Sequence, residues 1–328
     1  TAYEILTCDW SSDVCSSDLG GNTVWAQSAA SYPNKPTRLI VTFAAGGPTD
    51  FVARNIAAKL TDMFGQPVVV DVRAGGSGII GVEIAKGAAA DGYTLLQVSN
   101  THTANETLIP TKPFALMRDF VAVTPINYSD LLLVAHPGTG INTVNDLLSK
   151  ARAQPGKINY ASSGPGTPYH MAGELFKYMA KVDLVHFPYK GSSGARTDVL
   201  GGQVDLMFDA VTTMAEHVRA GKVKALATTG KTRSSVLPDV PTVHEAGVPN
   251  YEATVWVGLM APKGTPKEVI DRINSIVNQA MRQAELRQQW AKQGAVPMHM
   301  SAAEFDKFLT DDIQKWGAVI KSANIKVD

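Results

Sequence analysis

Apolar runs alternate with amphipathic stretches through the first third of the chain. Apolar runs typical of buried strands cover residues 38–43, 67–72 and 93–98. The first helix is expected to begin at Pro48, and its apolar face is formed by Val52, Ile56, Leu60 and Met63. A second, short helix is predicted over residues 79–86. Strands and helices alternating at this spacing predict βαβ units and a largely parallel sheet.

The alternation restarts near residue 131 after a less regular passage. Strands are predicted over residues 131–135, 159–162, 182–186, 204–208 and 224–229. Helices are predicted over residues 143–153 and 168–179. The chain therefore shows two series of α/β elements, and we predict one lobe from each series.

The C-terminal part is predicted to be mostly helical. One apolar helix face is formed by Ile270, Ile273, Ile276 and Val277, and another by Phe305, Phe308, Leu309, Ile313, Trp316 and Ile320. The segments Thr265–Glu268 and Ser301–Glu304 have the pattern of capping boxes. If these C-terminal helices pack on the first series of α/β elements, the first lobe is discontinuous in the sequence.

Length and charge narrow the class of protein. A chain of 328 residues is long for one hydrophobic core, which favours two domains. Thirty basic and thirty acidic residues give no net charge, and four of the acids precede Gly20, where there is no Lys or Arg. The remaining 30 basic against 26 acidic residues give +4, too little to favour nucleic acid or a membrane surface.

The opening segment is unlike the rest of the chain. Both cysteines, Cys8 and Cys15, lie in it, so no Cys-based metal site or thiol nucleophile is expected from Gly20 onward. Small residues at Ala26, Ser28 and Ala30 fit signal-peptidase cleavage, but the preceding residues are acidic rather than basic and apolar. The codons GAC GTG TGC TCT TCC GAT CTN encode residues 13–19 and match the end of a sequencing-library adapter. We interpret residues 1–31 as a damaged signal peptide fused to translated adapter; the alternative is a natural polar leader.

Two loops have matching surroundings in the two halves. Ala44–Asp50 (AAGGPTD) and Ser162–His170 (SSGPGTPYH) each follow a predicted strand and lead through a proline into a helix. Glycine permits close approach of backbone to a ligand, and the first turn of a helix attracts anions. Ligands in α/β sheets bind at the carboxyl ends of strands, where both loops lie. A pair of such loops favours a shared anion-binding cleft over two tight turns. Asp50 would repel an anion, so we leave its role open between capping, water binding and an ammonium contact.

Three other motifs suggest enzymes but lack necessary parts. Gly76–Gly81 spells G-x-G-x-x-G, but three residues separate it from the strand, and no acid lies about 20 residues on. Gly230–Thr232 resembles the end of a phosphate loop, but Ala225 occupies the position of the required glycine. His170 and Glu174 have no second histidine at ligand spacing, and Ser163 has no nucleophile elbow.

Several stretches together resemble the solute-binding receptors of tripartite tricarboxylate transporters, the Bug family. The similarity runs from about Tyr32 to the C-terminus, and its stretches are YPNKPTRLIVTFAAGGPTDFVAR, VRAGGSGIIG, DGYTLL, RDFVAV, INYASSGPGTPYHMAGELF, HFPYKGSS, LGGQVDLMFD, LPDVPTVHEAGVPNYE and APKGTPKEVID. The resemblance implies a two-lobed periplasmic-binding-protein-like fold of type II. Each lobe would be a mixed, mostly parallel sheet flanked by helices, with a cleft between the lobes. It also implies a cofactor-free, non-enzymatic receptor that resides in the periplasm and passes a small organic acid to membrane transporter subunits.

The resemblance also implies a division of the chain and a set of ligand-binding residues. We expect a first lobe of residues 32–127 plus 229–328, a second lobe of residues 128–228, and a hinge near residues 126–131 and 228–230. The ligand-binding residues carried over by position are Phe43, Ala44, Ala45, Gly46, Gly47, Thr49, Asp50, Ser162, Ser163, Gly164, Gly166, Thr167, His170, Asp209 and Ala210. We expect a monomer, no metal and no nucleic acid, with dicarboxylates favoured as ligands. The alternative is an α/β hydrolase or dehydrogenase acting on a small anion.

Overall fold

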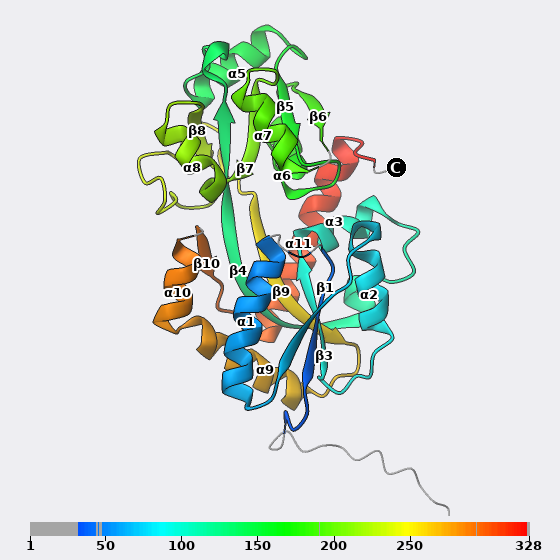
Figure 1. The fold of residues 1–328 in the computed structure, drawn as a ribbon. Coiled ribbons are helices and arrows are strands. Elements are labelled where there is room, and N and C mark those ends of the chain that lie inside the picture. The colour runs from blue at the N-terminus through cyan, green and yellow to red at the C-terminus, as the bar shows by residue number, and fades with distance from the viewer. Residues whose placement is uncertain (1–31, 44, 46–47, 190, 293, 327–328) are drawn as a thin grey trace, which may run out of the picture.

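Two lobes joined by long strands make up the fold, as Figure 1 shows. The computed structural model describes residues 32–43, 45, 48–189, 191–292 and 294–326. The predicted leader and three residues of the first loop, Ala44, Gly46 and Gly47, lie outside the described residues. Within the described residues, no helix combines the length and apolar character needed to cross a membrane.

In the described part of the chain, ten strands form one mixed, curled sheet. They are β1 (Thr37–Val41), β2 (Val68–Val72), β3 (Thr94–Ser99), β4 (Phe120–Ala135), β5 (Asn159–Ser162), β6 (Val185–Pro188), β7 (Leu206–Ala210), β8 (Lys224–Thr228), β9 (Thr254–Pro262) and β10 (Ala295–Pro297). Their order is β2-β1-β3-β9-β4-β7-β5-β6, and β8 and β10 also pair with β4. β1 is parallel to β2 and β3, and β5 is parallel to β6 and β7, whereas every pairing of β4 and β9 is antiparallel.

Helices flank the sheet in both lobes. They are α1 (Pro48–Phe64), α2 (Ile79–Lys86), α3 (Asn100–Leu108), α4 (Leu116–Asp119), α5 (Val144–Ala153), α6 (Pro168–Ala180), α7 (Ser192–Leu200), α8 (Val211–Arg219), α9 (Lys267–Met281), α10 (Ala284–Ala291) and α11 (Ala302–Ser322). Short 3₁₀ turns at Gly76–Gly78 and Pro137–Thr139 precede α2 and α5. The predicted α/β class is confirmed, with the mixed sheet that the resemblance implied.

Strand β4 connects the lobes. From Phe120 to Asp130 it runs along β9 with two register shifts, and from Leu131 onward it pairs with β7 and β8. The sequence pattern predicted only residues 131–135 of this strand and missed β9. Seven consecutive residues of β9, from Trp256 to Pro262, are buried, so the strand lacks the polar–apolar alternation of a half-exposed strand. The sequence signal that could have predicted this strand was its run of β-branched and aromatic residues, which ends at Pro262.

Residues 237–253 differ from the predicted division of the chain. Leu237 packs in a core cluster with Val134 and Met207 of the second lobe. Tyr251 packs beside Phe176 and donates a hydrogen bond from its hydroxyl to the Ala172 carbonyl at 2.8 Å. The chain therefore returns to the first lobe at β9, about 25 residues after the boundary expected at residue 228, because these apolar side chains complete the second core.

Helix α11 packs against both lobes. Phe305 and Leu309, near its start, belong to a cluster with Leu96 and Trp256 of the first lobe. Trp316, Val319 and Ile320, near its end, join a cluster that contains strands of the second lobe. Ser301 and Glu304 form the predicted capping box, which confirms the start of this helix.

The other predicted capping box is wrong. Helix α9 begins at Lys267, one residue after Pro266, and no side chain caps its start. The hydroxyl of Thr265 instead donates a hydrogen bond to the Pro262 carbonyl oxygen at 2.8 Å. The loop after β9 provides this nearby acceptor, which local sequence does not reveal.

Candidate ligand-binding site

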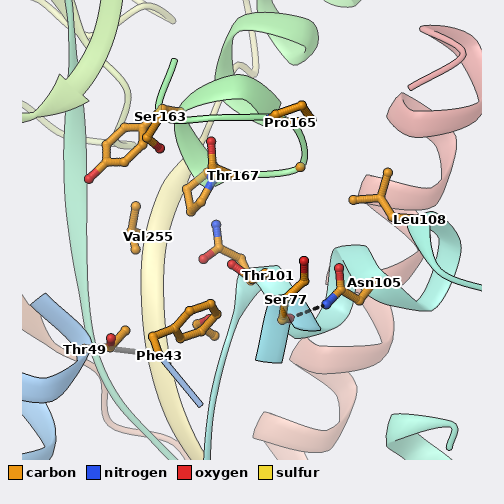
Figure 2. A pocket seen from close by; sticks show the side chains of 15 residues that line it. Phe43, Thr49, Ser77, Thr101, Asn105, Leu108, Ser163, Pro165, Thr167 and Val255 are labelled. Atoms are coloured by element: carbon orange, nitrogen blue, oxygen red, sulfur yellow. Dashed lines mark hydrogen bonds between the residues drawn. The ribbon is translucent and has the colours of Figure 1, made fainter. Parts of the chain in front are cut away.

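A cavity of about 310 Å³ lies between the lobes; we call it the first cavity. Figure 2 shows side chains from both lobes directed toward it. The lining residues are Phe43, Thr49, Ser77, Ser99, Asn100, Thr101, Asn105, Leu108, Ser163, Pro165, Gly166, Thr167, Pro168, Tyr169 and Val255. No charged side chain is among these described lining residues.

Helix starts converge on the first cavity. Thr49 is in the first turn of α1, Asn100 begins α3, and Thr167 is the N-cap of α6. The first N–H groups of a helix have no partner within that helix, and the aligned peptide dipoles place partial positive charge there. A cavity without charged side chains at several helix starts therefore suits a small anion held mainly by backbone donors and hydroxyls.

The β5–α6 loop is held in shape by its own residues. Gly164 and Gly166 have φ values of 132° and 71°, a region that favours glycine. Thr167 accepts a hydrogen bond from the His170 N–H and donates one of 2.7 Å to the Gly164 carbonyl. The Gly164 N–H donates to the Ser162 hydroxyl at 3.1 Å. These contacts direct Ser163, Gly166 and Thr167 to the cavity wall, while Ser162 and Gly164 support the loop from behind.

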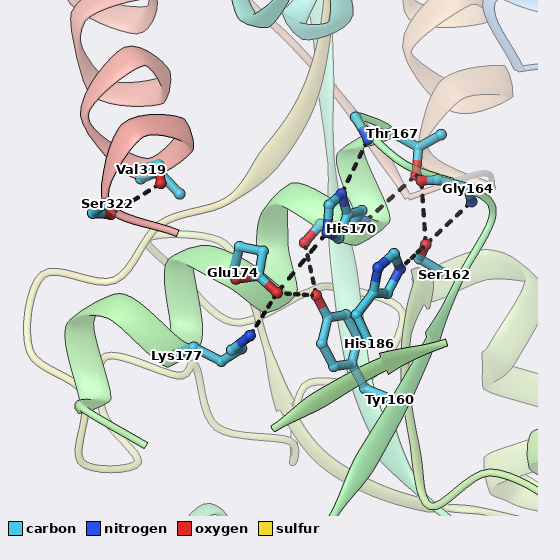
Figure 3. A network of polar contacts seen from close by, with 11 residues as sticks. Tyr160, Ser162, Gly164, Thr167, His170, Glu174, Lys177, His186, Val319 and Ser322 are labelled. Atoms are coloured by element: carbon cyan, nitrogen blue, oxygen red, sulfur yellow. Dashed lines mark hydrogen bonds and ion pairs between the residues drawn. The ribbon is translucent and has the colours of Figure 1, made fainter. Parts of the chain in front are cut away.

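His170 also supports this loop rather than lining the cavity. It is 5% exposed, and its Nδ1 atom accepts a hydrogen bond of 3.0 Å from the Gly166 N–H. Its ring stacks on His186 at 3.9 Å between centroids, and His186 Nε2 lies 2.7 Å from the Ser162 hydroxyl. Figure 3 shows this network behind the loop. The geometry indicates a positioning role for His170 in place of the predicted ligand contact.

The network requires neutral imidazoles. Burial lowers the pKa of His170 to about 4 and that of His186 to about 3. The Lys177 charge acts in the same direction on both rings, and the Glu174 charge opposes the shift of His186. Because His170 Nδ1 accepts a hydrogen bond, its proton is assigned to Nε2, which faces Glu174 at 3.9 Å. Glu174 in turn accepts hydrogen bonds from Tyr160 at 2.7 Å and Lys177 at 2.9 Å.

The β1–α1 loop has a different arrangement. Phe43 and Thr49 line the first cavity, while Asp50 lies in the first turn of α1 and lines neither this cavity nor its neighbour. Asp50 is buried and pairs with Arg54 at 2.9 Å, four residues along the helix. Gln97 donates a hydrogen bond of 3.0 Å to the Thr49 carbonyl, which holds the start of the helix. Ala45 is described but lines neither cavity.

A second cavity of about 290 Å³ adjoins the first, and both are lined by Thr49, Tyr169 and Val255. Asp209 and Ala210 lie there, so the structure places them in this second cavity rather than in the first. Asp209 is 1% exposed and pairs with Arg196, which sequence reasoning missed. Burial raises the pKa of Asp209, and the Arg196 charge acts against that shift.

Helix α3 is the main part of the first cavity that sequence reasoning missed. Its buried face consists largely of polar residues, which include Asn100, His102 and Asn105, so it shows no apolar stripe. Asn105 donates a hydrogen bond of 3.0 Å to the Ser77 carbonyl, which Figure 2 shows. His102 is buried, and burial lowers its pKa to about 4. A possible signal was Ser99 directly before Asn100, since serine is a frequent N-cap.

Comparison with known proteins identifies the family. The sequence profile of the tripartite tricarboxylate transporter family receptor matches residues 52–325. The chain belongs to this receptor family. The resemblance noted from the sequence motifs is thus confirmed, and the chain is a solute-binding receptor rather than an enzyme. The receptor is 36% identical over 302 residues to Protein BugT of Bordetella pertussis, covering 92% of this chain and 93% of that protein.

Solved structures of similar proteins share the receptor's fold. A structure described as a periplasmic transporter is 35% identical with a TM-score of 0.77, covering 90% of this chain and 100% of the other. A Rhodopseudomonas palustris protein solved with adipate is 33% identical, with a TM-score of 0.77 and coverage of 90% and 99%. MatC of Rhodopseudomonas palustris, solved with malate, is 30% identical, with a TM-score of 0.73 and coverage of 88% and 100%.

The G-x-G-x-x-G motif of the receptor packs against neighbouring residues. Among the residues that the structure describes, no group of three or more His, Cys, Asp or Glu side chains could hold a metal ion. Gly78 of the G-x-G-x-x-G motif packs close to Thr42 and His102, and Gly81 packs against the Arg73 carbonyl. These glycines therefore allow the start of α2 to lie close to the residues that follow β1 and β2, a structural use of the motif.

Proposed function

We propose that the protein is a periplasmic receptor that binds a small organic carboxylate in the first cavity and delivers it to the membrane subunits of a tripartite transporter. The observation that carries this proposal is the convergence of helix starts on a cavity lined by no charged side chain among the described residues. Such a site stabilises a carboxylate through oriented backbone N–H groups. Export through an N-terminal signal peptide and a monomeric state are parts of the proposal.

Dicarboxylates are the favoured ligand class. Two similar proteins were solved with adipate and with malate, and both of these molecules carry two carboxylates. The β1–α1 and β5–α6 loops face one cavity from opposite lobes, so each can hold one polar group of a ligand. We propose Phe43, Thr49, Ser163, Gly166 and Thr167 as the direct contacts. Ser162, Gly164 and His170 would act by shaping the loop.

A thermal-shift screen of small mono- and dicarboxylates, followed by calorimetry, tests the proposal. Ligand at about a hundred times its Kd should stabilise the native state by about 2.7 kcal/mol and raise the melting temperature. The corresponding diamides serve as uncharged controls and should have no effect. The ligand recovered afterwards should be chemically unchanged. Absence of stabilisation by any acid, or conversion of the bound acid, would overturn the proposal.

Closure of the lobes is the second part of the proposed mechanism. β4 changes partners from β9 to β7 near Asp130 and Leu131, which makes this crossing a natural place for a hinge. Small-angle scattering should show a smaller radius of gyration when the ligand is saturating. Scattering curves that are identical with and without saturating ligand would contradict hinge closure but leave binding intact.

A further inference from the structure

The second cavity differs from the first because it contains charged side chains. Its described lining residues are Thr49, Phe51, Val52, Asn127, Ser129, Asp130, Tyr169, Ser192, Arg196, Asp209, Ala210, Val211, Thr212, Thr213, Val255, Val257, Trp290 and Ala295. Arg196 is the one cationic residue among them. Ser192 begins α7 and Val211 begins α8, so the starts of two further helices also border this cavity.

Arg196 is held in a defined orientation. Its Nε and Nη2 atoms each lie 2.8 Å from the same Asp209 oxygen, Oδ2. The Asp209 side chain is 1% exposed, whereas that of Arg196 is 22% exposed, so the guanidinium covers the carboxylate. Its Nη1 group makes no hydrogen bond to any residue that the structure describes, and a guanidinium has five N–H donors in all. Donors therefore remain for an anion in the cavity.

The acidic residues of this cavity leave the free donors of Arg196 exposed. Asp209 is already paired with Arg196 beneath it. Asp130 follows Asn127 and Ser129 on β4, and alternate side chains of a strand leave on opposite faces. Tyr128, two residues before Asp130 and on the same face of β4, packs with the cluster of Trp256, away from Asn127 and Ser129. The Asp130 carboxylate lies against Gly230. Asp209 balances the formal charge of Arg196, but the guanidinium is the more exposed partner of the pair, so its N–H donors rather than the carboxylate oxygens of Asp209 face the cavity.

Asn127 provides a second, independent indication of a polar ligand. Its side chain lines the second cavity and is 3% exposed. Within the described part of the chain, its amide nitrogen makes no hydrogen bond. A buried donor without a partner is unfavourable, and a ligand oxygen in this cavity would supply the missing acceptor.

We propose that Arg196 is a specificity-determining residue, which binds a second anionic group of the ligand in the second cavity. This inference rests on the proposed function, since it assumes that one carboxylate occupies the first cavity. The two cavities share the walls formed by Thr49, Tyr169 and Val255, so a ligand that reaches both must pass these side chains. The receptor thereby selects extended dicarboxylates over monocarboxylates of the same length. A bidentate pair with the free edge of a guanidinium is the expected contact.

Calorimetry with the unbranched dicarboxylates from succinate to suberate, and with the monomethyl ester of each, tests the inference. The wild-type protein should bind its best diacid at least about tenfold more tightly than the matching monoester, the usual effect of one charge-assisted hydrogen bond. The double variant Arg196→Gln/Asp209→Asn removes both charges without leaving a buried carboxylate unpaired. It should lose this preference.

Two further variants keep the test decisive. Arg219→Gln removes an exposed arginine of α8 that pairs with Glu216, and it should keep the full preference. Arg196→Lys retains the cation and should keep part of the preference for the diacid. This variant replaces the double variant in the test if the double variant fails to fold. A wild type that binds diacid and monoester equally, or a folded double variant that still prefers diacids, overturns the role of Arg196. If the role of Arg196 is overturned but monoesters still bind, the proposed function stands. If no acid binds, both the role of Arg196 and the proposed function are refuted.

Discussion

The two ligand loops match in sequence but differ in how the fold supports them. The β5–α6 loop is held by buried side chains behind it, where His170 accepts from the Gly166 N–H and Ser162 accepts from the Gly164 N–H. The β1–α1 loop leads into a helix whose start is held by Gln97 of the neighbouring strand β3, with Asp50 paired to Arg54. Loops of similar sequence can therefore border one cavity while depending on different supporting residues. Substitutions behind the loops should affect binding only where such support exists.

The largest effect is expected from Gly166→Val in the β5–α6 loop. Gly166 lines the first cavity with a φ of 71°, so a side chain there both strains the backbone and fills ligand space. We expect affinity to fall by about a hundredfold or more, roughly 2.7 kcal/mol of binding energy, measured by calorimetry. Gly221→Val is the matched control, because Gly221 has a φ of 67° and open space around it. A folded Gly166→Val protein that binds like Gly221→Val would contradict the site.

His170→Phe should have the next largest effect. Phenylalanine preserves an aromatic ring beside His186 but removes the acceptor for the Gly166 N–H. A buried donor left without a partner costs about 1–3 kcal/mol, so affinity should fall about tenfold as the loop shifts. His170→Asn keeps an acceptor near the position of Nδ1 and should restore most of the affinity. Equal losses in the two variants would show that ring volume, rather than the hydrogen bond, matters.

The same residue should contribute to the pH dependence of stability. Its pKa is lowered from 6.5 to about 4 in the folded protein, so the unfolded chain binds the proton first on acidification. Its contribution to the free energy of unfolding is present above about pH 6.5 and is lost as the pH falls toward 4. The melting temperature of His170→Asn should therefore fall less than that of the wild type across this window.

Comparison with the variant is needed because other groups titrate in the same range. Burial and the charge of Glu252 raise the pKa of Asp130 to about 6, which has the opposite effect on stability, and His102 and His186 add to the loss. The contributions of Asp130 and His102 are common to wild type and variant. The His170 charge helps to lower the pKa of His186, so the difference between the two curves reports the stacked pair of His170 and His186. Parallel curves would refute this assignment.

The smallest effect is expected from Thr167→Ala. Loss of the N-cap of α6 should cost about 1 kcal/mol of stability, and loss of a hydroxyl on the cavity wall should weaken binding about three- to fivefold. Thr143→Ala removes the N-cap of α5, which lies outside both cavities, and should lower stability alone. Thr49→Ala in the β1–α1 loop extends the comparison of the two loops, and it should weaken binding to a similar degree. Unchanged affinity in Thr167→Ala would remove its hydroxyl from the site.

Local sequence was sufficient for the strand–loop–helix units and for the family. The helix from Pro48, the helix over residues 79–86 and the capping box at Ser301 depend on neighbours within a few residues, and all appear in the structure. The family was also recognisable from local sequence, because nine short stretches spread from Tyr32 onward resemble the receptors, and the family profile matches residues 52–325.

Long-range packing decided the remaining features. α3 carries a polar buried face and β9 is buried on both faces, so neither shows the periodicity of a half-exposed element. His170 appears beside cavity residues in the sequence, yet the turn of α6 directs its ring toward His186 behind the loop. Arg196 and Asp209 are thirteen residues apart and become partners only because α7 packs against β7. Contacts of this kind depend on which elements meet in space, and this is why the second cavity was absent from the sequence pattern.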